Sequence, residues 1–160
     1  MQIGLHLQTT GYVRRCDDII EVLVDLDTGA QVSCISKDWA QQNRLKPYNR
    51  PVPKKLGVVG GVEIKSYGAY WVRFTLRDTN GVTREFYRPF VAVERAPDEA
   101  PLLLNHAELQ QIGIWIHLLP DQTPEWYFVL HRGKPFVREE GLQNFENDFL
   151  AILEYTQWSR

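Results

Sequence analysis

The sequence has little cysteine and no long apolar run. Cys16 and Cys34 are its two cysteines, too few for the disulfide framework of a small secreted protein, so we expect a reducing, cytoplasmic setting. No apolar stretch approaches the roughly 20 residues that a membrane-spanning helix needs. Residues 1–15 also lack the order of a signal peptide. These absences predict a soluble protein with no membrane partner.

An excess of charge of one sign is also missing. The chain has 18 Lys and Arg against 20 Asp and Glu, and both signs are scattered along it. Nucleic-acid binding requires clustered basic residues, so we expect no nucleic-acid partner. The four histidines show no metal-ligand spacing, which predicts no metal and no other cofactor. They are His6, His106, His117 and His131.

What is present is an ordinary globular composition, with 160 residues and 44% hydrophobic residues. Length favours one main domain, which we place at residues 1–130. Residues 131–160 differ in character, with a polar linker followed by a predicted amphipathic helix. The apolar stripe of that helix consists of Leu142, Phe145, Phe149, Ile152 and Leu153.

Most of residues 1–130 reads as strand. Residues 19–26 form an apolar run that predicts a strand covered on both faces. Residues 69–76 alternate, with Tyr70, Val72, Phe74 and Leu76 on one face. Asn80-Gly81 predicts a hairpin turn. Pro89 indicates an edge or irregularity in the strand that follows. Two further strands are predicted at residues 114–119 and 126–130.

Two short helices interrupt this pattern. Residues 36–45 predict one, with Ser36 as N-cap. The other begins after Asn105, which can cap it. Glu108 stands three residues later, as in a capping box, and Gly113 can end the helix.

The stretch VLVDLDTGAQVSCIS, residues 22–36, places two aspartates at the end of an apolar strand. A calcium-binding loop that began at Asp25 would have Gly29 at its fifth position and Ser36 at its twelfth, where oxygen ligands are required, so that type of site is excluded. A phosphoryl-transfer strand of the haloacid-dehalogenase type would have Gly before Thr, and a strand–helix alternation would follow. Neither feature is present.

Asp27-Thr28-Gly29-Ala30 instead resembles the active-site motif of aspartic proteases. Two later segments resemble parts of the retroviral and retrotransposon proteases, the retropepsins, in the same order. LGVVGGVEIKSYGAY at 56–70 resembles their glycine-rich flap, and PLLLNHAELQQIGIWIHL at 101–118 resembles their late strand, helix and closing strand. The resemblance covers roughly Ile19 to Leu119.

The resemblance implies a mainly β, retropepsin-like, closed β-barrel-like fold with one short late helix, followed by the C-terminal helical tail. It implies an aspartic endopeptidase that cleaves a retroelement polyprotein in the cytoplasm or within virus-like particles. Asp27 would be catalytic, Thr28 would brace the active-site loops, and Gly29 would let the backbone approach the substrate. The active-site loop would then be Thr28, Gly29 and Ala30, and the flap would include Gly57, Val58, Val59, Gly60 and Gly61.

Catalysis of this kind needs two carboxyl groups. One carboxylate takes a proton from water, and a second carboxylic acid donates a proton to the carbonyl oxygen. Two ionised carboxylates about 4 Å apart repel by roughly 4 kcal/mol at an effective dielectric near 20, so such a pair holds one shared proton. The chain has one Asp-Thr-Gly, which predicts a homodimer with Asp27 from each subunit at the two-fold axis. Its substrate would be an extended peptide.

Three positions depart from the family pattern. Asp25 points to the same side of its strand as Asp27, at a position that is usually apolar or small and lines a substrate pocket. It either gives that pocket a preference for basic or hydrogen-bonding side chains, or tilts towards solvent or a neighbouring subunit's Lys or Arg. Asn105 and His106 stand where the family usually has glycine and a charged residue. These departures leave open a second function, a catalytically weak or inactive module used for dimerisation or peptide binding.

Overall fold

The computed structural model describes residues 6–30, 32–59, 62–118, 120–121 and 124–129. Over these residues the protein is mainly β, as predicted, with two short helices. No helix within the described ranges is long and apolar enough to span a membrane. The predicted C-terminal helix and the boundary at residue 130 fall outside the described residues.

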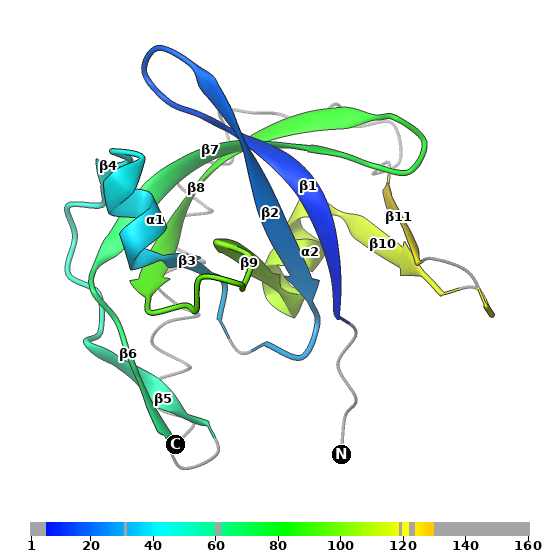
Figure 1. Ribbon diagram of the computed structural model, residues 1–160. Coiled ribbons are helices and arrows are strands. Elements are labelled where there is room, and N and C mark those ends of the chain that lie inside the picture. The colour runs from blue at the N-terminus through cyan, green and yellow to red at the C-terminus, as the bar shows by residue number, and fades with distance from the viewer. Residues whose placement is uncertain (1–5, 31, 60–61, 119, 122–123, 130–160) are drawn as a thin grey trace.

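Seven strands form the main sheet, in the order β1-β2-β9-β3-β8-β7-β4 (Figure 1). Residues Gly11–Val13 of β1 also pair with Phe74–Leu76 of β7, so the sequence of pairings returns from β7 to β1. The strands are β1 His6–Arg14, β2 Ile19–Asp27, β3 Cys34–Ser36, β4 Lys46–Pro47, β7 Ala69–Arg77, β8 Thr83–Val93 and β9 Leu102–Asn105.

Two separate hairpins accompany this sheet. One joins β5 (Lys55–Val59) to β6 (Val62–Lys65), and the other joins β10 (Ile114–His117) to β11 (Glu125–Phe128). Figure 1 shows the β5–β6 hairpin extending away from the sheet, towards the end of the molecule at which β2 finishes. The hairpin is therefore placed to approach whatever lies at the carboxyl end of β2.

The core forms where alternating strands turn their apolar faces inward. In β7, Val72, Phe74 and Leu76 are fully buried, which confirms the predicted alternation. The prediction that residues 19–26 are covered on both faces was wrong for the first part of β2. Ile19 is 57% exposed and Leu23 48% exposed, because β2 starts in a two-stranded arm with β1 and meets β9 only from Val24 onwards.

Both helices begin at the predicted caps. Ser36 precedes α1 (Lys37–Gln42), and its hydroxyl accepts a hydrogen bond from the Trp39 N–H. Asn105 caps α2 (His106–Ile112), and Gly113 ends that helix in the left-handed conformation, with φ of 82°. The late helix is thus held at both ends by residues that the sequence identifies.

The predicted hairpin at Asn80-Gly81 joins β7 to β8, with Gly81 at φ 83°. The turn is stabilised by the buried side chain of Asp78, whose Oδ1 accepts the Val82 N–H. Its Oδ2 accepts the N–H of Phe128, which ties the β10–β11 hairpin to this turn. Pro89 pairs with Trp71 without a register shift, so the predicted irregularity is not present; it lies just before Val91–Val93, the part of β8 that pairs with β3.

Candidate active site

Asp27 is the last residue of β2 and is partly exposed at the turn that follows. The Gly29 N–H donates a hydrogen bond of 2.9 Å to Asp27 Oδ1. The Ala30 N–H donates to the Asp27 main-chain oxygen at 3.3 Å. In this tight turn a main-chain donor holds one carboxylate oxygen and fixes its direction.

The next residues of the loop are anchored to the start of α2. The Ser33 hydroxyl donates to Asn105 Oδ1 at 3.0 Å, and the Asn105 N–H donates to Ser33 Oγ at 2.9 Å. Asn105 Oδ1 also accepts the Glu108 N–H as the helix cap. Because β2 and β9 are parallel, with Asp27 paired to Asn105, one buried amide side chain joins the loop, the sheet and the helix.

The structure shows which of the two residues at the start of α2 anchors the Asp27 loop. His106 is exposed and is not part of the anchor. Asn105 makes the connection instead. The Asn105 N–H donates to Ser33 and the Glu108 carboxylate pairs with Arg88 at 2.9 Å, so both groups of the predicted capping box have partners outside it.

A cavity of about 760 Å³ lies beside the Asp27 loop. Gly29 and Ala30 line one side of it, and Leu56, Ile64 and Lys65 of the β5–β6 hairpin line the other. The hairpin is irregular: its register shifts between Lys55 and Gly57. The predicted flap and the predicted active-site loop therefore face the same cavity.

Individual flap residues are described to different extents. In the hairpin ladder, Gly57 pairs with Ile64, Val58 with Glu63 and Val59 with Val62. Gly60 and Gly61, predicted at the tip of the flap, lie outside the described residues.

Asp25 occupies a place that neither sequence interpretation foresaw. It is 5% exposed, so the prediction that it tilts towards solvent was wrong. Its Oδ2 accepts a hydrogen bond of 2.9 Å from Arg95 Nη2 of the same chain. The two side chains are 7% and 8% exposed, which makes this a buried ion pair. Asp25 is not among the residues that line the cavity beside Asp27, whereas Arg95 is.

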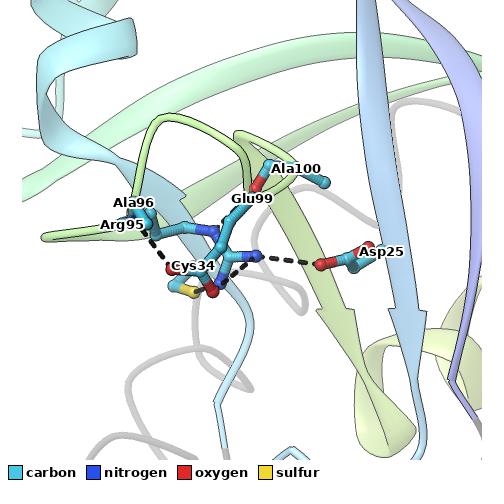
Figure 2. Close-up of polar contacts among 6 residues, drawn as sticks. All are labelled: Asp25, Cys34, Arg95, Ala96, Glu99 and Ala100. Carbon is cyan, nitrogen blue, oxygen red and sulfur yellow. Dashed lines mark hydrogen bonds and ion pairs between the residues drawn. The ribbon is translucent and has the colours of Figure 1, made fainter.

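Arg95 is the centre of a cluster on the segment that follows β8 (Figure 2). Its Nε donates to the Ala100 carbonyl at 2.6 Å, and its Nη1 lies 3.9 Å from the sulfur of Cys34. Glu99 lies 3.7 Å from Nη2 and accepts the Ala96 N–H. Sequence reasoning missed Arg95, which lies 70 residues beyond its partner Asp25 and belongs to no motif.

Cys34 is buried in β3 and lines the cavity. Burial raises the pKa of its thiol from 9.0 to about 11, and the neighbouring Arg95 charge offsets only part of that effect. The thiol is therefore protonated at neutral pH, which rules out a thiolate nucleophile at this position. Within the described residues, no cluster of three His, Cys, Asp or Glu side chains could hold a metal ion.

Comparisons with known proteins show similarity to solved structures only. No family model matches the chain, and no curated protein matches it. Among solved structures, the retroviral protease-like domain of Ddi1 from Leishmania major matches with 15% sequence identity and a TM-score of 0.46. The match covers 76% of this chain and 94% of that chain. A similarity of this size does not assign the chain to a family.

Proposed function

We propose that the protein is an aspartic endopeptidase that acts as a homodimer, with Asp27 of each subunit in the active site. One observation carries the proposal. Gly29 and Ala30, which follow Asp27 in the Asp-Thr-Gly-Ala loop, and the β5–β6 hairpin line a common cavity, and both segments were identified in the sequence by their resemblance to retropepsins. A cavity between a catalytic loop and a hairpin lid can enclose an extended peptide and exclude water from the reaction.

In the proposed reaction, one Asp27 carboxylate takes a proton from a water molecule, whose oxygen attacks the carbonyl carbon of the peptide bond. The partner's Asp27, protonated, donates its proton to the carbonyl oxygen, giving a neutral tetrahedral intermediate. Collapse of that intermediate breaks the C–N bond, and the nitrogen leaves with a proton from the dyad. The Gly29 N–H holds Oδ1 in position throughout.

The bound peptide would lie along β6 and form main-chain hydrogen bonds in the manner of an added strand. Val32 and Leu103 contribute apolar walls to the cavity, suited to side chains of that peptide. The substrate that the retropepsin resemblance implies is the polyprotein of a retroelement, with Thr28 bracing the two loops across the two-fold axis.

The first prediction concerns Asp27→Asn, which keeps the shape of the side chain but removes its basicity. We expect hydrolysis of a random octapeptide library to fall by at least about 10³-fold, because general acid–base catalysis is lost. Mass spectrometry of the library measures the cleavage. Asp38→Asn in α1, an exposed acid outside the cavity, is the matched control and should cleave normally.

Equal activity of Asp27→Asn and the native chain would contradict the proposal. If the native chain binds peptides but cleaves none between pH 4 and pH 7, the endopeptidase proposal is wrong. The second function, a peptide-binding or dimerisation module, then takes its place. The departures from the family pattern at Asn105 and His106 are the observation that favours this second candidate.

A further inference from the structure

Arg95 is the buried charged side chain that lines the cavity. The Arg95 side chain is 8% exposed, yet it lines the cavity together with Cys34 and Leu103. Because Cys34, the neighbour of Arg95 Nη1, also lines the cavity, we infer that the guanidinium forms part of the wall that an entering substrate side chain would meet.

Two of the three nitrogens of this guanidinium have strong acceptors. Nε donates to the Ala100 carbonyl at 2.6 Å, and Nη2 donates to Asp25 at 2.9 Å. Nη1 donates to the Cys34 thiol at 3.9 Å, and sulfur is a weak acceptor. Nη1 carries two N–H groups, and its contact with the weak acceptor Cys34 uses one of them, so this nitrogen can donate to an incoming oxygen.

The charges around the cavity disfavour a basic ligand. Glu63 lies 3.3 Å from Lys55, and Glu94 lies 3.7 Å from Lys37, so both acids that line the cavity already have cationic partners. A lysine or arginine side chain would meet Arg95 without a carboxylate left to pair with. The preference for basic side chains expected from Asp25 alone is thus reversed by Arg95.

Lys65 of β6 also lines the cavity, but a carboxylate that reaches Arg95 is disfavoured. Asp25 and Glu99 lie 2.9 Å and 3.7 Å from Nη2, so the positive charge of Arg95 is already balanced. A further buried carboxylate would lose its hydration and be repelled by both acids. A neutral amide oxygen accepts from Nη1 without either cost.

We propose that Arg95 is a specificity-determining residue that selects substrate peptides with a primary amide side chain, asparagine or glutamine, at the position that enters this cavity. The inference rests on the proposed function for the identification of the cavity as the peptide site. Asp25 acts through Arg95: it balances the charge and holds the guanidinium in place.

The experiment measures peptide selection separately from catalysis. The full-length Asp27→Asn chain is immobilised and panned with a random octapeptide library, and retained peptides are sequenced by mass spectrometry. We expect Asn and Gln to be enriched about tenfold over Leu at one position, as one hydrogen bond to a charged donor allows. The same panning is repeated with a chain that carries Asp25→Leu and Arg95→Met in addition to Asp27→Asn. In this variant we expect the Asn and Gln enrichment to disappear and Leu or Met to be favoured instead.

A second variant, Arg95→Lys, tests the inference with a substitution that keeps the positive charge next to Asp25. Arg95→Lys retains a cation for Asp25, but one ammonium group cannot reach Ala100, Asp25 and the cavity together, so the amide enrichment should fall to the background level. Circular dichroism confirms that each variant is folded.

Cleavage of the same library by the native chain separates this inference from the proposed function. Amide enrichment without cleavage supports the inference and contradicts the proposed enzyme. Absence of amide enrichment, enrichment of Lys, Arg, Asp or Glu at that position, or an enrichment unchanged in both Arg95 variants overturns the inference.

Discussion

At the scale of single residues, the site depends on partners that lie far apart in the sequence. Asp25 and Arg95 are 70 positions apart, and Ser33 and Asn105 are 72 apart. In each case the interaction is made by a polar side chain that would be costly to bury alone. The residues that flank Asp27 are therefore held by long-range contacts in addition to the local turn.

The second prediction tests the energetics of the Asp25–Arg95 pair. Asp25→Leu leaves a buried guanidinium without its carboxylate, and we expect the free energy of unfolding to fall by about 3–5 kcal/mol. Adding Arg95→Met should restore it to near the native value, because a buried ion pair and an apolar pair are often equal in stability. Urea denaturation of both single variants and the double variant measures the coupling.

The exposed pair Lys55–Glu63 provides a control for this cycle. Its side chains are 58% and 38% exposed, and Glu63→Gln should change the stability little, because solvent screens such pairs. Additive losses from the two single substitutions at Asp25 and Arg95 would show that their contact is not energetically coupled.

The third prediction follows from the Cys34 thiol. Its pKa is raised by burial to about 11 in the folded chain, so above pH 9 the unfolded chain loses the proton while the folded chain keeps it. The unfolded state is thereby favoured, and stability present below pH 9 falls as the pH rises to 11, by on the order of 3 kcal/mol.

Urea denaturation at several pH values, in the presence of a reductant, checks this slope. Cys34→Ala has no thiol to titrate, so its stability should decline less steeply than that of the native chain between pH 9 and 11. Cys16→Ala, which removes an exposed thiol, should decline as the native chain does. Parallel declines for the native chain and Cys34→Ala would contradict the assignment.

At the scale of elements, the late helix α2 anchors the loop that follows Asp27. Asn105 caps α2 and also binds Ser33, whereas Ser36 caps α1 and lies outside the cavity. The two caps are chemically similar, but only one of them contacts the Asp27 loop. Comparing them separates the contribution of a cap to stability from its contribution to the site.

The fourth prediction makes that comparison. Asn105→Ala and Ser36→Ala should each lower the free energy of unfolding by about 1–2 kcal/mol, the usual effect of losing a helix cap. Asn105→Ala should in addition lower kcat for peptide cleavage, because Ser33 loses its acceptor and the Asp27 loop loses its anchor. Urea denaturation and cleavage rates measure the two effects. A proportional loss of activity in both variants would mean that the anchor has no separate role.

The elements that the sequence predicts best are those with local chemical signals. Capping residues identify both helices, and alternation identifies the buried face of β7. The long strand β1 was missed because its sequence, HLQTTGYVR, alternates weakly and contains Gly11. Packing favours glycine there: a Cβ at this position would lie 3.0 Å from Leu76 and 3.1 Å from Val24, where β1 pairs with both β2 and β7.

In the candidate site, too, the sequence predicts the parts that have a local motif and misses the parts that depend on tertiary contacts. Asp27, the loop after it and the flap hairpin follow from the motif and its order along the chain. The partners Arg95 and Ser33 do not, because they depend on which strands become neighbours: β9 between β2 and β3 brings these segments together. Asp25 was identified from its type and position, but its environment required the tertiary structure.

At the scale of the whole molecule, the proposal requires two copies of the chain. Each subunit supplies one Asp27, and the second carboxyl group must come from a partner. A catalytic site divided between subunits has a consequence that no monomeric enzyme shares. A subunit that carries Asp27→Asn should disable the native subunit with which it pairs.

The fifth prediction uses this property. Native chain at a fixed concentration is mixed with increasing amounts of Asp27→Asn, and the rate of peptide cleavage is measured after subunit exchange. With equal amounts and random pairing, about half of the native chains remain in native homodimers, so the rate should fall to about half and continue to fall with excess variant. Asp27→Asn combined with a substitution that prevents association, identified by sedimentation, should not inhibit. A rate that is independent of added Asp27→Asn would show that each chain carries a complete catalytic site, and the shared dyad would be wrong.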